Sequence, residues 1–431
     1  MEREEWSSTL GFILASIGSA VGIGNIWRFP YIVGANGGGA FLVPYLIAVF
    51  LFGLPLMVLE LAIGRSTGRS IVSAFRSIQQ RFTAAGIAII AVVSLILGYY
   101  LVITGWVLAY AFFFALGRPV EFGAFTGSYL PLAFFLLSGL AVYVTVRSGV
   151  REGIERLSRY LIPALLVILI FLVAFSVTEP GAFEGIEFYL SPDFSKLADP
   201  AVWIAAFGQA FFSLSVGMGI LITFGSYLRK GPLFRNATII AVADMLVAVL
   251  AGLVIFPLVF TAGLDPAAGV NLAFISLPTA FMEIQYGMLL GTLFFLMLFA
   301  AALTSAVSML EVPVAALMDS CGYPRKRATL LVFAVIMLLG LPSALSYTAL
   351  NLEVFGTPFL DLADYMFGTI GLIVAGLIVS IVGGWFMNRT RICAEIGGCG
   401  WQQRAYMVLI RYGVPAILLV TLIGNFFRVV G

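Results

Sequence analysis

Two scarcities in this sequence exclude whole classes of chemistry. The chain contains no histidine, which is the commonest metal ligand and a frequent proton relay in enzymes. It has only three cysteines, Cys321, Cys393 and Cys399, and the spacing of the last two matches no zinc or redox motif. We therefore expect free thiols in a reducing compartment. We find no nucleophile–base pair either, so the sequence argues against an enzyme.

Charge is also scarce. Only 10% of the 431 residues are charged, whereas a soluble domain carries about 25%. Hydrophobic residues make up 61% of the chain and its mean hydropathy is +1.09. Apolar runs of about 20 residues recur along the whole length, and each is long enough to cross a bilayer. The sequence predicts an all-α polytopic membrane protein, and a net charge of +2 gives no reason to expect a nucleic-acid partner.

Hydropathy and charge predict the number and the direction of the spans. We expect eleven spans, over about residues 9–34, 38–64, 84–116, 128–147, 157–177, 201–228, 234–262, 286–318, 327–347, 359–387 and 405–428. Alternate connections, together with Arg3 and Arg411, collect 19 of the 23 lysines and arginines on one side of the bilayer. The positive-inside rule then places the N-terminus in the cytoplasm and, after an odd number of spans, the C-terminus outside the plasma membrane.

The first span is interrupted by a glycine-rich run, GSAVGIGNIWRFP, at residues 18–30. Because glycine weakens a helix, Gly18, Gly22 and Gly24 predict that the helix unwinds here. Lipid cannot satisfy the backbone groups that unwinding frees, so these groups must face protein, water, an ion or a substrate. Arg28 adds a full charge to an apolar span, which is typical of a functional site.

The sixth span contains a second interruption, QAFFSLSVGMG, at residues 209–219. An offset of five spans predicts two inverted halves, residues 1–177 and 201–387, joined by an extracellular loop at 178–200 and followed by a last span within 388–431. A single interruption is more often a kink or a packing contact. Two interruptions at matching positions favour a transport site instead.

Other polar groups lie at membrane depth. Thr304 and Ser305 offer oxygens to a hard cation, although such hydroxyls often bond back to their own helix. Asp244 is a lone carboxylate that needs a cation or a donor. Glu60 and Glu311 fit two roles equally well, a structural cap on irregular backbone or a functional group.

Several motifs in the chain are similar to those of one transporter family. They are Trp6, the 18–30 run, NGGGAF at 36–41, Gly105-Trp106, NLAFISLP at 271–278, LTS at 303–305 and GTIG at 368–371. With them the sequence resembles the neurotransmitter:sodium symporter family, most closely its bacterial members. The resemblance implies the leucine-transporter fold, a 5+5 inverted repeat with broken helices 1 and 6. The family usually has twelve spans, and this chain has one helix beyond the core of ten, as some bacterial members do.

The same resemblance implies two sodium sites and no organic cofactor. The first site would comprise Ala20, Asn25, Ser213 and Asp244, completed by the carboxylate of the substrate. The second would comprise Gly18, Val21, Ala301, Thr304 and Ser305. A substrate that also coordinates an ion must bind together with that ion, which couples the two.

The substrate pocket implied by the resemblance is mostly apolar. Its residues would be Ser19, Ala20, Gly22, Gly24, Ile96, Tyr100, Phe212, Ser213, Ser215, Met218, Ser305 and Met309. Amine-carrying members have an aspartate at the position of Gly22, so glycine leaves room for a carboxylate that the Tyr100 hydroxyl would hold. Met218 and Met309 replace a phenylalanine and an isoleucine of the leucine-carrying pattern. Because methionine is adaptable, they favour a broad range of large aliphatic or aromatic L-amino acids.

The same resemblance implies which residues form the gates and whether transport depends on chloride. Arg28 and Asp364 would form the outer gate. Arg3 and Asp319 would form the inner gate, together with Trp6 and Tyr227. Asp244 supplies a fixed negative charge where chloride-dependent relatives are neutral. We therefore expect chloride independence, although Tyr45, Gln209 and Ser213 match positions near the anion site of the family.

The expected function is a sodium-coupled symporter that imports a hydrophobic L-amino acid by alternating access, with the monomer as the functional unit. Carriage of another small zwitterion, coupling to protons and ligand reception without transport are the alternatives. A protonatable Asp244 would be the group that returns a proton.

Overall fold

The structure is a computed structural model, and it describes residues 4–191, 193–266, 272–398 and 400–430, with side chains up to residue 426. Helices make up nearly all of the regular structure in these residues. The exception is a small antiparallel hairpin, in which β1 (Glu353–Val354) pairs with β2 (Thr357–Pro358) in the register Glu353 to Pro358 and Val354 to Thr357. The predicted all-α class is confirmed.

The α-helices are α1 Thr9–Ala20, α2 Phe29–Ala35, α3 Leu42–Ile47, α4 Leu54–Thr67, α5 Ile71–Ile78, α6 Thr83–Ala115, α7 Phe122–Thr126, α8 Leu130–Arg147, α9 Arg156–Ser176, α10 Ala182–Leu190, α11 Pro200–Ser213, α12 Ile220–Ser226, α13 Leu233–Thr261, α14 Leu277–Glu283, α15 Gly287–Cys321, α16 Arg325–Leu345, α17 Phe359–Ala363, α18 Leu372–Ile381, α19 Arg389–Glu395, α20 Trp401–Val408 and α21 Val414–Val430. Short π-helical segments extend or join them at η1 Gly24–Arg28, η3 Ala48–Gly53, η5 Val150–Glu155, η7 Leu272–Ser276, η8 Asp364–Gly371, η9 Val382–Phe386 and η10 Leu409–Gly413. Three 3₁₀ turns lie at η2 Gly38–Phe41, η4 Gln80–Phe82 and η6 Phe194–Ala198.

The membrane-length helices coincide with the predicted spans. Among the described residues, 9 helices are long and apolar enough to cross a bilayer, and a tenth span forms if α1 and the bent continuation η1–α2 are counted together. The predicted sixth span consists of α11 and α12, with 14 and 7 residues, and neither is long enough alone. The exact count of eleven is therefore not confirmed by helix length and composition.

Burial separates inner helices from outer ones. The apolar window of α15 is 83% buried and that of η2–α4 is 78% buried, whereas those of α8 and α16 are 33% buried. The first helix, α1, contacts α9, α13 and α15. The first broken span therefore lies among the inner helices, and all seven residues of α12 in the second broken span are buried. The outer helices present apolar side chains as a lipid-facing surface requires.

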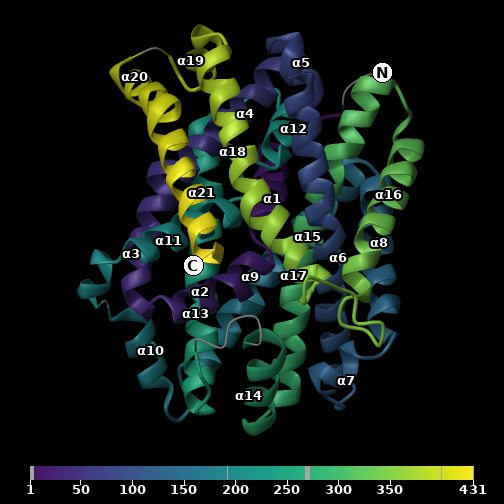
Figure 1. The fold of residues 1–431 in the computed structure, drawn as a ribbon, viewed down its shortest axis with the longest axis vertical. Coiled ribbons are helices and arrows are strands. Elements are labelled where there is room, and N and C mark those ends of the chain that lie inside the picture. The colour runs from purple at the N-terminus through teal and green to yellow at the C-terminus, as the bar shows by residue number, and fades with distance from the viewer. Residues whose placement is uncertain (1–3, 192, 267–271, 399, 431) are drawn as a thin grey trace.

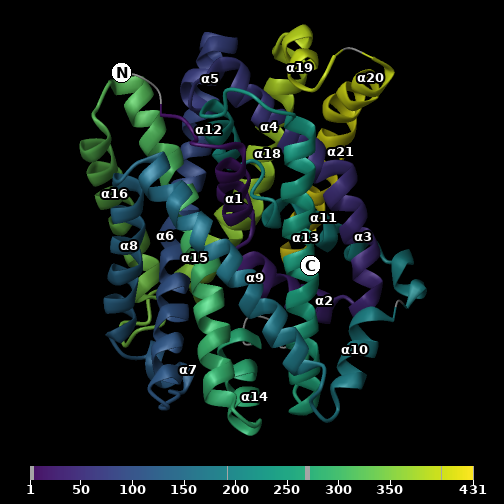
Figure 2. The ribbon, with the colours of Figure 1, turned by 180° about the vertical axis from the view of Figure 1, so that it is seen from behind.

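The two ends of the molecule are distinct. Both views place the N-terminus, α5, α12, α19 and α20 at one end and α7, α10 and α14 at the opposite end (Figures 1 and 2). The predicted loop at 178–200 contains α10 and lies at the end opposite the N-terminus. We use "the N-terminal end" below for the first of these two ends.

Candidate ion and substrate site

The first break lies just after α1. Helix α1 ends at Ala20, Val21 takes extended backbone angles (φ −70°, ψ 112°), and the chain resumes at Gly24 as a π-helix, with an overall bend of 49°. Gly18 does not unwind as predicted, because it lies inside α1. A Cβ there would lie 3.0 Å from the Cβ of Thr304, so this glycine permits α1 to approach α15 closely.

The second break lies between α11 and α12. Ser215, Gly217 and Gly219 have positive φ angles of 53°, 87° and 73°, a backbone conformation that favours glycine. The Gly217 N–H donates to Oε1 of the buried Glu60 at 2.5 Å, while Oε2 of Glu60 has no partner among the described residues. Of the two roles left open for Glu60, the structure shows the cap on irregular backbone.

One carbonyl joins the two breaks to α15. The Ser19 carbonyl accepts hydrogen bonds from Ser215 Oγ at 2.9 Å and from Ser305 Oγ at 2.8 Å. Thr304 Oγ1 instead donates within its own helix, to the carbonyls of Ala300 at 3.1 Å and Ala301 at 3.0 Å. The residues predicted for the second sodium site therefore meet where α1 ends against the middle of α15.

A buried polar cluster forms beside the first break. Asn25 Nδ2 donates to Oδ1 of Asp244 at 2.7 Å and to Ser213 Oγ at 2.8 Å, and Ser213 Oγ donates to Oδ2 of Asp244 at 2.7 Å. Asp244 is completely buried in α13. The structure thus brings together three side chains predicted for the first sodium site, and their oxygens are of the kind that hard cations prefer.

The predicted pocket is enclosed. A Cβ at Gly22 would lie 2.8 Å from Ser305 Oγ and 2.9 Å from the Tyr100 hydroxyl, which also accepts from the Ile23 N–H at 3.2 Å. A Cβ at Gly24 would meet the Phe212 ring at 2.8 Å. The remaining predicted side chains of the pocket are buried, apart from the half-buried Phe212: Ser19, Ala20, Ile96, Ser215, Met218 and Met309. Polar atoms thus gather at Gly22, and Ile96, Phe212, Met218 and Met309 provide the large apolar side chains.

The outer gate residues line one cavity of about 110 Å³, together with Tyr100 and Phe212. The Arg28 guanidinium lies 4.2 Å from the centre of the Phe212 ring, a cation–π contact. The described residues include no ion pair between Arg28 and Asp364. Their pairing as a gate stays a prediction.

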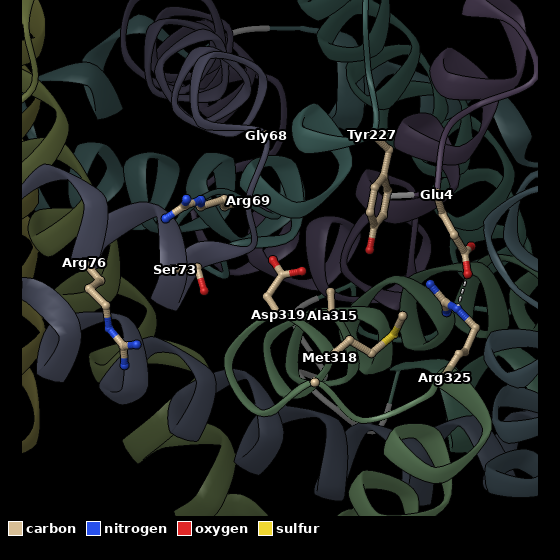
Figure 3. Close-up of a pocket in the computed structure, with 11 residues that line it drawn as sticks. Glu4, Gly68, Arg69, Ser73, Arg76, Tyr227, Ala315, Met318, Asp319 and Arg325 are labelled. Carbon is tan, nitrogen blue, oxygen red and sulfur yellow. Dashed lines mark hydrogen bonds and ion pairs between the residues drawn. The ribbon is translucent and has the colours of Figure 1, made fainter. Parts of the chain in front are cut away.

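The inner gate residues lie at the N-terminal end. Tyr227 and Asp319 line a cavity of about 580 Å³ that also contains Arg69 and Arg76 (Figure 3). The Asp319 carboxylate accepts from the Ser70 N–H at 2.7 Å. The indole of the buried Trp6 donates to the Phe224 carbonyl at 3.0 Å and lies against the Tyr227 ring. Arg3, the predicted partner of Asp319, lies outside the described residues.

The sequence analysis missed an ion-pair network at this end. Arg325 donates to both oxygens of the buried Glu311, at 2.7 and 2.8 Å, and the Tyr227 hydroxyl donates to the same carboxylate at 2.6 Å. Arg325 also bonds Glu4 at 2.5 Å (Figure 3). A signal was present, because Glu311 is a carboxylate inside the apolar helix α15 and Arg325 begins the next helix, α16, which runs back beside it.

The chain has counterparts among known proteins. The model of the family described as the sodium:neurotransmitter symporter family matches residues 3–122 and 124–430. The chain belongs to this family. An uncharacterized sodium-dependent transporter of Methanocaldococcus jannaschii is 38% identical, covering 95% of this chain and 88% of the relative. Another from Haemophilus influenzae is 35% identical over 99% of both chains.

A solved structure agrees with the fold. The crystal structure of MhsT in complex with L-phenylalanine superposes with a TM-score of 0.91 at 40% identity, covering 99% of this chain and 100% of that one. The predicted leucine-transporter fold is confirmed. As a member of the symporter family the protein is a sodium-dependent membrane transporter and not an enzyme. Its relatives include sodium- and chloride-dependent transporters of GABA in Rattus norvegicus and of taurine in Homo sapiens.

Proposed function

We propose that the protein is a sodium-coupled symporter that imports a large aliphatic or aromatic L-amino acid together with two sodium ions, independently of chloride. The observation that carries the proposal is a single hydrogen bond. The Gly22 N–H, beside the gap that faces Tyr100 and Ser305, donates to Oδ1 of Asn25 at 3.1 Å. The gap and the Asp244 cluster therefore share one short stretch of backbone, and a carboxylate in the gap lies next to an ion in the cluster.

The first sodium ion binds at the Asp244 cluster. Its ligands are the Ala20 carbonyl, Asn25, Ser213 and Asp244, and the substrate carboxylate completes the set. Hard cations take several oxygen ligands, and this cluster combines a carboxylate, a hydroxyl and an amide in a buried position. Neither the sodium ion nor the amino acid binds tightly alone, because each forms part of the binding site of the other.

The second sodium ion binds between α1 and α15. The carbonyls of Gly18, Val21 and Ala301 and the hydroxyls of Thr304 and Ser305 provide its ligands. The close approach of Gly18 to Thr304 supports this assignment, since a side chain at residue 18 would separate the two helices. Thr304 can bind the ion and keep its present bond within the helix, because a hydroxyl oxygen keeps lone pairs for a cation while it donates.

The substrate side chain occupies the apolar part of the pocket. Ile96, Met218 and Met309 are at most 3% exposed and come from three different parts of the chain. The likeness to MhsT, whose crystal structure contains L-phenylalanine, supports an aromatic ligand. Two methionines can repack around side chains of different shape, which extends the range to branched aliphatic amino acids.

Chloride has no role in the proposed cycle. The Asp244 carboxylate lies within the same hydrogen-bonded cluster as Ser213, whose hydroxyl is 3.4 Å from that of Tyr45. A fixed anion there balances the charge of sodium and repels a second anion. Transport then alternates between the outer gate at Arg28 and Asp364 and the inner gate at Trp6, Tyr227 and Asp319, with the N-terminus in the cytoplasm and the C-terminus outside.

Uptake into proteoliposomes tests the proposal. Labelled L-phenylalanine, with the other amino acids as competitors, is expected to accumulate under an inward sodium gradient, equally in chloride and in gluconate. Asn25→Ala is expected to weaken sodium and substrate binding together, each by about tenfold or more, because buried bonds to an ion or a charged group contribute about 1.5–3 kcal/mol. Asn425→Ala, in α21 and outside the proposed site, is the matched control and should leave both unchanged.

Three results would contradict the proposal. Binding without accumulation would indicate a receptor. Uptake that needs chloride would remove the assigned role of Asp244. Loss of only one ligand in Asn25→Ala would disprove the shared site.

A further inference from the structure

Two π-helical segments meet towards the N-terminal end of the molecule and bond to each other. One is η9, the last part of the helix Phe359–Phe386, and the other is η10, within the helix Trp401–Phe426. Arg411 Nε donates to the Gly384 carbonyl at 2.7 Å, and the Trp385 indole donates to the Arg411 carbonyl at 3.0 Å. Both views place α18 beside α21, with α19 and α20 above them at that end (Figures 1 and 2). Because π-helical turns often occur at functional sites, the outward side of this junction is a candidate site.

The sequence explains both hydrogen bonds. The Gly384 carbonyl lies in the last turn of its helix, where carbonyls have no partner within the helix. Pro415 has no N–H to offer to the Arg411 carbonyl one turn earlier. A Cβ at Gly384 would lie 3.0 Å from the Ile410 side chain and 3.5 Å from the Arg411 side chain, so glycine permits the two helices to approach closely.

The guanidinium of Arg411 has no negative partner within the described part of the chain. It belongs to an outer helix of membrane length, whose apolar window is only 33% buried. A charge in such a helix is costly unless it meets an anion or reaches the polar surface of the bilayer. The Gly384 carbonyl engages only Nε. The two terminal nitrogens of the planar guanidinium are therefore left for another acceptor, and a phosphate fits their fork.

A second guanidinium reaches η9 from η4, just before α6. The Arg81 guanidinium lies 5.0 Å from the centres of both the Phe82 ring and the Phe386 ring. The Arg411 guanidinium lies 5.8 Å from the centre of the ring of Trp385, the residue next to Phe386. Among the described residues, no carboxylate forms an ion pair with Arg81 either. Two positive charges without a counter-charge therefore lie against neighbouring rings at one helix end.

The aromatic rings at this junction are open to the surroundings. Trp385, Phe386 and Tyr412 are between 40% and 57% exposed, and the rings of Trp385 and Tyr412 pack edge to face with centres 5.2 Å apart. Exposed aromatic rings beside arginines at the ends of membrane helices are typical of the headgroup region of a bilayer. A soluble anion would satisfy the arginines and leave these rings in water, whereas a phospholipid also covers the rings.

We propose that this junction binds an anionic phospholipid of the leaflet at the N-terminal end of the molecule. The terminal nitrogens of Arg411 hold the lipid phosphate, and Arg81 adds a second positive charge at the same helix end. Trp385, Phe386 and Tyr412 contact the glycerol and the first part of the acyl chains. The site selects an anionic headgroup over a zwitterionic one, because neither arginine has a carboxylate beside it, in the described residues, to receive an ammonium group. The proposal does not rest on the proposed transport function.

Native mass spectrometry of the purified full-length protein tests the site by lipid titration. The wild type is expected to bind phosphatidylglycerol about fivefold or more tightly than phosphatidylcholine with the same acyl chains, as one favourable charge at a membrane surface allows. Arg411→Gln should weaken phosphatidylglycerol binding by about fivefold or more and remove most of this preference. Arg81→Gln should act in the same direction with a smaller loss. The matched control is Arg156→Gln, because Arg156 lies at the same end, is exposed and pairs with Glu152 at 3.7 Å.

Fluorescence quenching locates the lipid without a change of charge. Brominated phosphatidylglycerol should quench the tryptophan emission of the wild type more strongly than brominated phosphatidylcholine does. This difference should shrink in Trp385→Phe, which keeps an aromatic ring and removes the emitting group at the site. Because the measurement uses no arginine variant, it decides the proposal even if Arg411→Gln does not fold.

Several results would overturn the proposal. One is equal binding of the two lipids to the wild type, and another is unchanged phosphatidylglycerol binding in folded Arg411→Gln. An equal loss in Arg156→Gln would indicate a diffuse effect of surface charge. Displacement of phosphatidylglycerol by an excess of inorganic phosphate would indicate a site for a soluble anion and not for a lipid. A preference for phosphatidylglycerol that disappears in Arg411→Gln and persists in Arg156→Gln would support the lipid site, whether or not the protein transports an amino acid.

Discussion

The two breaks look alike in the sequence and are built differently. In the first break the backbone angles of Val21 are open to most residues, and Gly22 is required for the space that faces Tyr100 and Ser305. In the second break Gly217 and Gly219 have positive φ angles, so glycine is required for the conformation itself. The comparison teaches that one glycine-rich pattern can keep a space between side chains at one site and allow a backbone turn at another.

The freed backbone groups are also satisfied differently. In the first break the Ser19 carbonyl accepts two hydroxyls, and the Gly22 N–H donates to a neutral amide. In the second break the Gly217 N–H donates to a buried carboxylate, Glu60. The bonds of the first break can be exchanged for those of an ion or a substrate. The hydrogen bond of the second break instead fixes the conformation of the backbone at Gly217.

The largest effect is expected for Gly217→Ala. An alanine at residue 217 would have to adopt a left-handed conformation, which costs about 1–2 kcal/mol. Its Cβ would lie 2.9 Å from the Gly376 nitrogen, and this overpacking adds about 1–3 kcal/mol. We expect a loss of several kcal/mol and little folded protein, measured as the melting temperature in detergent and as the monodisperse fraction. Gly68→Ala is the control, because Gly68 has a φ of 60° but nothing lies within 4 Å of its Cβ in the described structure. A loss of stability no greater than in that control would show that the backbone of the second break can rearrange at little cost.

Gly22→Ala is expected to preserve the fold and impair the ligand. Its Cβ would meet the Ser305 and Tyr100 hydroxyl oxygens, which are ends of side chains that can shift, so the melting temperature should fall by only a few degrees. Filling the gap should weaken amino-acid binding by about tenfold or more, because a displaced carboxylate loses bonds of about 1.5–3 kcal/mol. Scintillation proximity binding of labelled L-phenylalanine measures this change. Retained affinity in a folded variant would contradict the assignment of the gap to a carboxylate.

The sequence predicts the fold better than it predicts the contacts. Apolar runs of bilayer length place α6, α13 and α15 within a few residues, because a run of about 20 apolar residues is typical of a helix that spans a membrane. Gly18 is the clear error: a glycine in an apolar helix predicts unwinding, but the structure uses it for close approach to Thr304. Propensity describes a residue in its own helix and carries no information on which helix will lie beside it.

Contacts between distant segments were the hardest to predict. Gly384 and Arg411 belong to different helices, and neither is part of a motif that marks a binding site. Asp244 was easier to identify, because a lone carboxylate in an apolar helix demands a partner wherever the chain places one. Buried charge is therefore visible in the sequence, whereas a space left empty for a charge from another helix is not.

The smallest effect is expected for Glu60→Gln, and it tests how the second break is satisfied. The amide oxygen of glutamine can still accept from the Gly217 N–H, so this variant should lose less than about 1 kcal/mol of stability, whereas Glu60→Ala leaves that N–H unsatisfied in the interior and should lose about 1–3 kcal/mol. Denaturation in detergent with the sodium-bound protein measures both. If the glutamine variant loses as much as the alanine variant, the second break depends on the negative charge of Glu60 and not on the hydrogen bond alone. It would then resemble the first break, where the Asp244 carboxylate beside Asn25 and Ser213 is proposed to act through its charge.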